Sequence, residues 1–543
     1  KETKVTQGRT YVTSYSFDKN GNLSQITYPS GRKVTYALDT ADRVSSVKTT
    51  KGATTTTLAS SVAHKPYGGI SSMTYGNGLA RTVGYDQQYR ITGIQTGAVQ
   101  SLSYSHDANG NITAITNVLN PTKNKTFSYD ALDRLTGGTG PWGSLAWTYD
   151  PVGNRQTQVE NGATSTYSYQ AGTNRLTGVS GASPLSFTLD QNGNTTSENA
   201  KTYTFNQNNR LIKATESGAT KGEYTFNANG QRATKKTGST IRVFHHDQQG
   251  NLIAETSSTG ATLAEYLWLE GLPLSKIDSG GTRYVHTDHL GTPVLMTSPT
   301  KAIVWQIEAK PFGDGASITG SAVMNLRFPG QYYDAETGLH QNWMRDYSSS
   351  IGRYIRPDPL NHATVRFWLT EDYSDYRLYS SSDIVDVDPF GIHRPHRFAP
   401  YAYATNNPLA QSDLTGLWSA CITAARGGGA KICIGQDPCT GGNFVQIIAG
   451  VGIGLSASYS PGGGCPCGCS QGGAGFLGAG FSAGGGFGKV GGSVTGSAGW
   501  SLPPPPLGTP AYCEEMSGSW NTKTGAWKLG ASLVGGFNGA FPY

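Results

Sequence analysis

Charge is scarce in this sequence. Only 14% of its 543 residues are Asp, Glu, Lys or Arg, and the formal net charge is +6. Nucleic acid binds to concentrated basic patches, and a net charge spread this thinly over so long a chain does not indicate one. We therefore expect no nucleic-acid partner.

Long apolar runs and an N-terminal leader are also missing. No stretch of about 18 uninterrupted apolar residues is present, which predicts that no helix spans a membrane. The first residues lack the charged and then apolar pattern of a signal peptide. Lys1 lies in mid-pattern, which indicates a processed or excised fragment.

No cysteine precedes Cys421. Because all the cysteines lie at one end of the chain, we expect a C-terminal piece that is cross-linked by disulfides in an oxidising space. Their number is odd, so one cysteine would remain unpaired. A thiolate cluster for a soft metal at Cys465–Cys469 is the alternative, but its spacing completes no four-cysteine site. The seven disulfide candidates are Cys421, Cys433, Cys439, Cys465, Cys467, Cys469 and Cys513.

Glycine and tyrosine are abundant instead. The chain has 73 Gly and 29 Tyr, which with the low charge favours one large β-architecture with many turns. A unit of about 20 residues recurs: an aromatic residue, any residue, an aromatic or apolar residue, Asp or Asn, and then a turn such as Gly-Asn or Asp-Arg. The Asp or Asn positions are Asp18, Asp39, Asp107, Asp130, Asp150, Asp190, Asn206, Asn227 and Asp247.

Each unit predicts two short strands joined by a tight turn. The aromatic alternation has a period of two, and Gly, Asn and Asp tolerate the positive φ that hairpin turns need. An Asp just before a turn is expected to cap local backbone N–H groups rather than to bind a ligand. The aromatic residues are expected to pack between neighbouring hairpins, as repeat units do.

The unit resembles the YD repeat of Rhs proteins, of bacterial toxin complex components and of teneurins. Further segments are similar to those of bacterial Rhs proteins: a histidine-containing repeat, a Pro-Phe-Gly element and the Rhs-associated core. The resemblance covers about residues 10 to 417. The segments that carry it are Tyr284–Pro293, Lys310–Gly313, Arg327–Leu339, Gly352–Pro359 and Tyr401–Pro408.

The resemblance implies an all-β fold in which YD hairpins spiral into a large hollow β-cage that encloses a variable C-terminal polypeptide. It divides the chain into a YD-repeat shell at 1–300, an Rhs-associated core at 301–417 with an insert at about 361–400, and a Gly- and Cys-rich domain at 418–543. A sheet wound against itself protects its edges, and its interior can hold a chain that should not act prematurely.

The resemblance also implies that the core cuts its own chain. The matching aspartates are Asp358 and Asp413, and the scissile bond is Leu417–Trp418. Two carboxyl groups brought close together cannot both ionise, so one can hold a proton and polarise the carbonyl while the other activates water. Arg353 or Arg356 is expected to hold one of the two ionised.

Three features depart from the family pattern. Leu414 stands where Pro is expected, and an insert of about thirty residues separates the two aspartates. The insert has its own Asp-Pro-Phe-Gly-Ile run at 388–392, so cleavage after Ile392 is an alternative. Self-cleavage and an uncut chain therefore both stay open.

The histidines predict no metal site. Two of them are adjacent and two are separated by two residues, but no third ligand lies at a recognisable spacing. We expect solvated or packed histidines and no cofactor. The residues considered are His245, His246, His286, His289, His340, His362, His393 and His396.

After Leu417 the composition changes: 33 residues are Gly, eight are charged and none is His. This argues against an enzymatic cargo, because nuclease, deaminase and hydrolase toxins need acids, bases or zinc ligands. Alternation at Lys489–Leu502 and Trp527–Phe537 predicts strands, which suit either a membrane-inserting hairpin or small barrel, or a Gly-rich β-domain that never meets lipid. Phe444–Tyr459 could instead be helical.

The leading hypothesis is a secreted or surface-exposed bacterial Rhs shell that encloses and delivers its own C-terminal segment as a non-enzymatic, membrane-active toxin. The expected partners are that segment, an immunity protein, secretion machinery and a target membrane. The alternative is an extracellular structural or adhesive protein whose uncleaved C-terminal domain mediates self-association, since unpaired strand edges template such contacts.

Overall fold

The computed structural model describes residues 1–66, 69–315, 317–359 and 399–417, and beyond them the backbone of eight strands between 420 and 535. The chain separates into two compact units, Lys1–Trp418 and Ser419–Tyr543. Within the described ranges there is no α-helix, and the helical elements are the 3₁₀ turns η1 (Pro121–Lys123) and η4 (Ala404–Asn406). No helix among these residues is long and apolar enough to cross a bilayer. The all-β prediction is confirmed.

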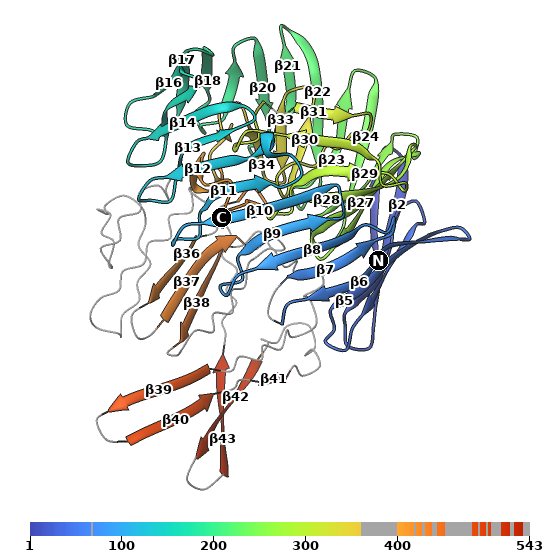
Figure 1. Ribbon diagram of the computed structural model, residues 1–543, viewed down its shortest axis with the longest axis vertical. Helices are drawn as coiled ribbons and strands as arrows, with labels where there is room; N and C mark the ends of the chain where they lie inside the picture. The colour runs from blue at the N-terminus through green and yellow to red at the C-terminus, as the bar shows by residue number, and fades with distance from the viewer. Residues whose placement is uncertain are drawn as a thin grey trace. The chain divides into compact units, whose positions relative to one another are not determined.

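Thirty-one strands of the first unit form one sheet, in which every strand pairs antiparallel with the next strand along the chain (Figure 1). The first sixteen are β1 (Glu2–Thr6), β2 (Arg9–Phe17), β3 (Leu23–Thr27), β4 (Lys33–Leu38), β5 (Val44–Lys51), β6 (Thr54–His64), β7 (Ile70–Tyr75), β8 (Ala80–Tyr85), β9 (Ile91–Thr96), β10 (Gln100–His106), β11 (Ile112–Asn117), β12 (Lys125–Tyr129), β13 (Leu135–Gly140), β14 (Gly143–Tyr149), β15 (Arg155–Glu160) and β16 (Ala163–Tyr169).

The sheet continues with fifteen more strands. They are β17 (Leu176–Gly181), β18 (Leu185–Leu189), β19 (Thr195–Glu198), β20 (Lys201–Phe205), β21 (Leu211–Glu216), β22 (Ala219–Phe226), β23 (Arg232–Thr237), β24 (Thr240–His246), β25 (Leu252–Ser257), β26 (Thr262–Leu269), β27 (Leu272–Asp278), β28 (Gly281–Thr287), β29 (Pro293–Thr297), β30 (Ile303–Glu308) and β31 (Ser317–Gly320).

The repeated Asp builds each turn. In the unit of β12 and β13, Asp130 Oδ1 accepts hydrogen bonds from the backbone N–H groups of Leu132 at 2.9 Å and Arg134 at 3.0 Å. Asp133 completes the turn with a φ of 60°, in the left-handed region that Asp tolerates. Asp18, Asp39, Asp86, Asp247 and Asp288 accept the same two bonds in their own turns. The predicted capping role is confirmed.

Neighbouring units are tied to one another at the turns and at the aromatic positions. Arg134 Nη1 donates to Asp150 O in the next turn at 2.8 Å, and its guanidinium lies 5.0 Å from the Tyr149 ring centroid. The Tyr149 hydroxyl donates back to Leu135 O at 2.7 Å. The aromatic residues thus pack between hairpins as predicted, and the turns form a hydrogen-bonded ladder along the edge of the sheet.

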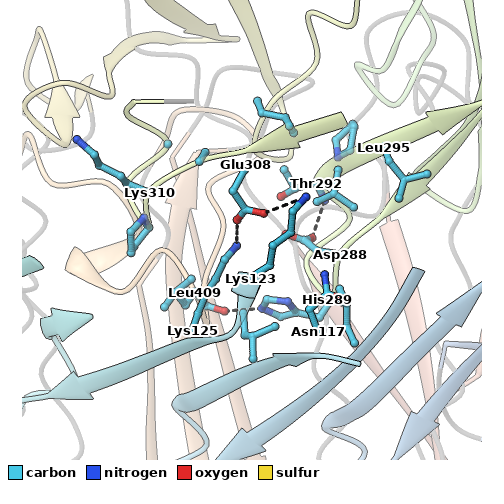
Figure 2. Close-up of a pocket in the computed structure, with 18 of the residues that line it drawn as sticks. Asn117, Lys123, Lys125, Asp288, His289, Thr292, Leu295, Glu308, Lys310 and Leu409 are labelled. Carbon is cyan, nitrogen blue, oxygen red and sulfur yellow. Dashed lines mark hydrogen bonds and ion pairs between the residues drawn. The ribbon is translucent and has the colours of Figure 1, made fainter. Parts of the chain in front are cut away.

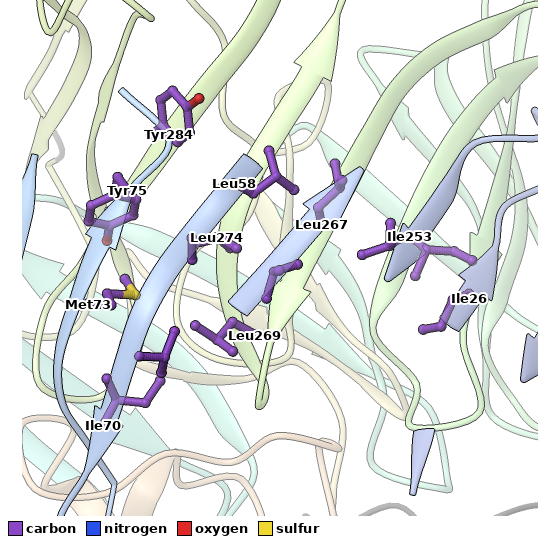
Figure 3. Close-up of a cluster of buried hydrophobic side chains, with 14 of the residues drawn as sticks. Ile26, Leu58, Ile70, Met73, Tyr75, Ile253, Leu267, Leu269, Leu274 and Tyr284 are labelled. Carbon is purple, nitrogen blue, oxygen red and sulfur yellow. The ribbon is translucent and has the colours of Figure 1, made fainter. Parts of the chain in front are cut away.

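The beginning of the sheet packs against a part that follows it by more than 200 residues. Leu58 on β6 and Leu267 on β26 are both fully buried in one hydrophobic cluster, in which side chains of β3–β7 face those of β25–β28 (Figure 3). The Tyr28 hydroxyl donates to Tyr266 O at 2.8 Å across this cluster. Burying these apolar faces against each other explains why the sheet winds back on itself rather than staying open.

The residues that follow the sheet, 321–359 and 399–417, are called the core segment below. They contain a four-stranded antiparallel sheet of β32 (Gln331–Asp334), β33 (Leu339–Asn342), β34 (Arg345–Ser348) and β35 (Arg353–Tyr354). Side chains of the core segment join the hydrophobic clusters of four successive stretches of the large sheet. These side chains are Met324, Leu326, Tyr332, Leu339, Ile351, Ile355 and Leu409.

Amide side chains of the core segment also dock onto the ladder of turns. Asn406 Nδ2 donates to Gly153 O at 2.8 Å, and Asn407 Nδ2 donates to Asp133 O at 2.9 Å. The Tyr401 hydroxyl donates to Gly193 O at 2.8 Å. The Tyr401–Pro408 motif therefore fixes the chain that leads to Asp413 against three different repeats.

Within its described residues, the second unit contains three small antiparallel sheets. Phe444 lies in a strand, so the helical alternative for Phe444–Tyr459 is wrong as far as Gly450, and the rest of that range lies outside the described residues. Cys421 and Cys433 are opposite one another in the register of their strands. Cys439, Cys465, Cys467 and Cys469 lie outside the described residues. The strands are β36 (Ala420–Ala425), β37 (Gly429–Gln436), β38 (Asn443–Gly450), β39 (Gly480–Gly486), β40 (Lys489–Thr495), β41 (Ala498–Trp500), β42 (Tyr512–Asn521) and β43 (Ala526–Gly535).

One capping Asp makes stability depend on pH. Burial raises the pKa of Asp247 from its ordinary 3.8 to about 6, although Gln249 and Asn251 donate hydrogen bonds to it. A raised pKa means that the folded state binds the proton more tightly, so this contribution to stability is complete below about pH 4 and is lost as the pH rises through about 6. Between pH 4 and 7 we expect the native protein to lose about 3 kcal/mol of its free energy of unfolding as Asp247 ionises. The Asp247→Asn variant should not show this loss. Denaturant unfolding at successive pH values measures the difference.

Asp39→Asn is the matched control. Hydrogen bonds from Arg43 lower the pKa of Asp39 to about 2, so its titration falls below the window and its stabilisation is lost only in stronger acid. An amide is compatible with the turn, because Asn227 holds the same position in its own repeat and accepts a hydrogen bond from the Gln231 N–H at 2.9 Å. Parallel curves for Asp247→Asn and the native protein would contradict the assignment.

Candidate functional site

The two aspartates predicted for self-cleavage meet at one arginine. Nη2 of Arg345, on β34, lies 2.9 Å from Asp358 Oδ2 and 3.0 Å from Asp413 Oδ2. The exposed fractions of the three side chains are 1%, 2% and 12%, so both ion pairs lie out of bulk water. Asp358 follows β35 closely, and Asp413 arrives on the docked chain of the core segment. Two aspartates that are 55 positions apart in the sequence thus share a single guanidinium nitrogen.

Arg345 also fixes the chain around the two carboxylates. Its Nε donates to Gly416 O at 2.5 Å, and its Nη1 donates to Pro400 O at 3.1 Å. The guanidinium lies 3.6 Å from the centroid of the Tyr354 ring. Burial acts to lower the pKa of Arg345, but Asp358 and Asp413 outweigh burial and raise the pKa. The group therefore stays charged.

Asp413 is held by three further groups. The Tyr354 hydroxyl donates to Asp413 Oδ2 at 2.7 Å, the Leu417 N–H donates to Oδ1 at 3.2 Å, and Asn342 Nδ2 donates to the backbone O at 2.8 Å. Burial raises the pKa of Asp413; Arg345 opposes this rise and Asp358 adds to it. Asp413 thus retains a proton more readily than an ordinary Asp.

Two glycines let the chain at 413–417 approach the small sheet. Gly330 has a φ of +81°, and a Cβ there would lie 2.0 Å from Leu414 O. Gly416 has a φ of +67°, and a Cβ there would lie 2.3 Å from Asn342 O. Met344 N–H donates to Thr415 O at 2.9 Å, which adds a backbone bond between β33–β34 and this chain. Leu414, which stands where the family pattern has Pro, is 45% exposed.

Arg353 and Arg356 contact the turns of the large sheet. Arg353 Nη2 donates to Asn174 O at 2.7 Å, and Arg356 Nη1 donates to Asn209 O at 2.6 Å. Burial lowers the pKa of Arg356 to about 9, and Asp358 is close enough to oppose that shift. The arginine that pairs with both carboxylates is Arg345, which lies thirteen residues before Asp358 and which sequence spacing did not indicate.

Other predicted positions are placed as follows. Leu417 lies at the end of the described core segment, whereas Trp418 and the segment 360–398, which includes Ile392, lie outside the described residues. His245, His286 and His340 are buried and hydrogen-bonded to Thr256, Thr297 and Gln331, and burial lowers the pKa of each to about 3. Among the described residues, no three His, Cys, Asp or Glu side chains are grouped as metal ligands.

Sequence and structure comparisons identify similar proteins. The family described as Teneurin YD-shell matches residues 70–383, and the RHS Repeat matches residues 17–54. The chain is 25% identical over 275 residues to the tRNA3(Ser)-specific nuclease WapA of Bacillus spizizenii, which is 48% of this chain. It is 27% identical over 304 residues to the double-stranded DNA deaminase toxin A of Burkholderia cenocepacia, which is 52% of this chain.

A solved structure shares the fold. The Tc holotoxin pore of Photorhabdus luminescens aligns with 77% of this chain at a TM-score of 0.60 and 19% sequence identity, which is a likeness of fold. The chain spans 12% and 19% of the two curated relatives and 22% of that solved chain. The predicted fold class, a shell of YD hairpins, is confirmed.

Proposed function

We propose that this chain, which belongs to the teneurin YD-shell family, is part of a bacterial toxin shell that cuts its own chain at Leu417–Trp418 and delivers the segment that follows. The observation that carries the proposal is the meeting of Asp358 and Asp413 on Arg345, with the Leu417 N–H bonded to Asp413. Two carboxyl groups and the last residue before the scissile bond are thereby assembled in one buried place.

The two carboxyl groups take different roles. Asp413, whose pKa is raised by burial, holds the proton and polarises the scissile carbonyl. Asp358, ion-paired with Arg345, activates water, as in other paired-carboxyl hydrolases. Water adds across the peptide bond, Leu417 gains the new carboxylate, and the nitrogen of Trp418 takes the proton and leaves as an amine. The reaction requires no cofactor.

The proposal that the shell delivers a toxin is supported by the relatives and by the composition of the segment after Leu417. Two relatives have names of toxins or nucleases with substrates of their own. The segment after Leu417 has eight charged residues and no His, which favours a membrane-active rather than a catalytic cargo. Its partners would be the shell itself, an immunity protein, secretion machinery and a target membrane, and its place of action would lie outside the producing bacterium.

The intact mass of the purified full chain under denaturing, reducing conditions tests the proposal. We expect two fragments that meet at Leu417–Trp418 in the native protein and one unbroken chain in the Asp413→Asn variant, because the amide can neither hold nor release the acidic proton. Asp314→Asn, which alters a carboxylate at the Pro-Phe-Gly element, is the control that should leave cleavage unchanged.

A single unbroken native chain would overturn self-cleavage. The insert between the aspartates would then favour the second function, a permanent extracellular scaffold whose C-terminal domain mediates self-association or attachment. Fragments that meet after Ile392 would instead place the cleavage site in the insert.

A further inference from the structure

The two oxygens of the Asp413 carboxyl group have different partners. Oδ2 lies 2.7 Å from the Tyr354 hydroxyl oxygen and 3.0 Å from Arg345 Nη2. Oδ1 lies 3.2 Å from the backbone N of Leu417, the residue before the proposed scissile bond. Which of the two oxygens carries the acidic proton therefore depends on the direction in which the Tyr354 hydroxyl points its hydrogen.

Asn342 fixes that direction. Its Nδ2 donates to the backbone O of Asp413 at 2.8 Å, and a carbonyl can only accept, so the orientation of the amide is settled. The same Nδ2 lies 2.7 Å from the Tyr354 hydroxyl oxygen, which must accept there. The single hydrogen of that hydroxyl is then left for Asp413 Oδ2. Asn342 and Tyr354 are 0% and 1% exposed, so bulk water is not an alternative partner.

The chain that carries Asp413 is held independently of these hydrogen bonds. Before it, at the cavity drawn in Figure 2, His289 Nε2 lies 2.7 Å from Leu409 O. After it, the backbone N–H of Met344 donates to Thr415 O at 2.9 Å. Removing the tyrosine hydroxyl should therefore leave this backbone in place and change only the hydrogen bonding of the carboxyl group.

We propose that Tyr354 is a positioning residue that places the acidic proton of Asp413 on Oδ1, the oxygen beside Leu417. Two donors already point at Oδ2, and one of them is a charged guanidinium, so Oδ2 is the less favourable place for a further hydrogen. The Leu417 carbonyl carbon is two bonds from the nitrogen that contacts Oδ1, so the proton faces the scissile bond. This assignment rests on the proposed function, in which Asp413 is the acid.

The proton on Oδ1 takes part in both halves of the hydrolysis. The water oxygen bonds to the Leu417 carbonyl carbon, Asp358 takes a proton from the water, and Oδ1 gives its proton to the carbonyl oxygen. The C–N bond then breaks, Asp358 gives its proton to the leaving nitrogen, and the former carbonyl oxygen returns its proton to Oδ1. Both carboxyl groups end as they began, and water is the only reactant consumed.

Tyr354→Phe tests the assignment through the pH profile of cleavage. The full chain is made by cell-free translation and shifted to buffers from about pH 4 to 9, and intact mass follows the cut fraction over time. Cleavage needs the protonated acid, so its rate falls as the pH rises and Asp413 ionises. The Tyr354 hydroxyl acts to lower the pKa of Asp413, because it donates to the charged form.

Removing the hydroxyl should therefore move this fall to higher pH by about one unit. Cleavage at the optimum should slow about tenfold, because the proton is no longer fixed on Oδ1. The pH at which the rate has fallen by half is read from the shape of the profile, so it does not require that every molecule of the variant folds.

Tyr347→Phe is the matched control. Tyr347 is as buried as Tyr354, lies 5.7 Å from it between ring centroids, and donates its hydroxyl to Phe312 O at 2.8 Å. Each variant loses one buried hydrogen bond, so the two should lose similar stability in denaturant unfolding. Only Tyr354→Phe should move the pH profile.

The possible outcomes separate this assignment from the proposed function. A native chain that stays uncut at every pH would overturn both. A native chain that is cut, with the same rate and profile in Tyr354→Phe, would overturn the assignment alone. An equal shift in Tyr347→Phe would do so too, and so would slower cleavage of Tyr354→Phe without a shift, which is what a purely structural role predicts.

Discussion

Arg345→Met is expected to lower the free energy of unfolding of the Lys1–Trp418 unit by about 3–5 kcal/mol, the usual effect of removing one partner from a buried ion pair. The variant would leave Asp358 and Asp413 facing each other without the guanidinium they share, and Gly416 O and Pro400 O without their donor. Denaturant unfolding followed by tryptophan fluorescence measures the loss. Intact mass measures whether cleavage is lost as well.

Arg43→Met is the matched control for this prediction. Arg43 pairs with Asp39 at 2.9 Å, but their side chains are 38% and 29% exposed, so the same substitution should change the stability by less than about 1 kcal/mol. Asp358→Asn combined with Arg345→Met should recover part of the lost stability, because it removes a buried carboxylate that Arg345→Met leaves without its guanidinium. Equal effects of Arg345→Met and Arg43→Met would contradict the central role of Arg345.

Gly416→Ala is expected to displace the chain that carries Asp413 and Leu417. Its Cβ would lie 2.3 Å from Asn342 O and 2.9 Å from Arg345 N, both backbone atoms that cannot turn away. We expect a loss of about 2–4 kcal/mol from crowding and the positive φ together. A shift of about 1 Å at a reacting group can slow a reaction about 100-fold, so cleavage should slow at least that much.

Gly338→Ala separates crowding from backbone conformation. Gly338 has a φ of +78°, close to that of Gly416, but nothing lies within 4 Å of an added Cβ. This variant should lose only about 1 kcal/mol and keep the native rate of cleavage. The two stabilities come from the same denaturant titration, and the rate comes from the mass spectrum at successive times after synthesis. Similar losses in both variants would show that the close approach of Gly416 is not required.

The repeat made the fold predictable from the sequence. Each unit has its own signal, since an aromatic alternation and an Asp cap, such as that of Asp130 on Leu132 and Arg134, recur with successive hairpins. The way the sheet winds back on itself was harder to predict from the sequence. The contact of Leu58 with the strands near Leu267 depends on how much each hairpin twists, and no single residue encodes the sum of many twists.

The candidate site was predictable only in part. The family motif indicated Asp358 and Asp413, but the arginine between them could not be chosen by distance along the chain, because β34 brings Arg345 between the two carboxylates, whereas Arg353 and Arg356 donate to the turns of the large sheet. The roles of Gly330 and Gly416 could not be predicted from the sequence either. Their importance depends on which backbone lies opposite, and only the three-dimensional structure provides this information.

The winding of the sheet has a consequence for synthesis on the ribosome. The apolar face that includes Tyr28 and Leu58 is covered by residues around Tyr266 and Leu267, more than 200 positions later. At roughly 5–20 residues per second, that face stays uncovered for about 10–50 s while the rest of the sheet is translated. We therefore expect the nascent chain to bind chaperones that recognise apolar strands, and slowing translation between these two regions should increase its aggregation.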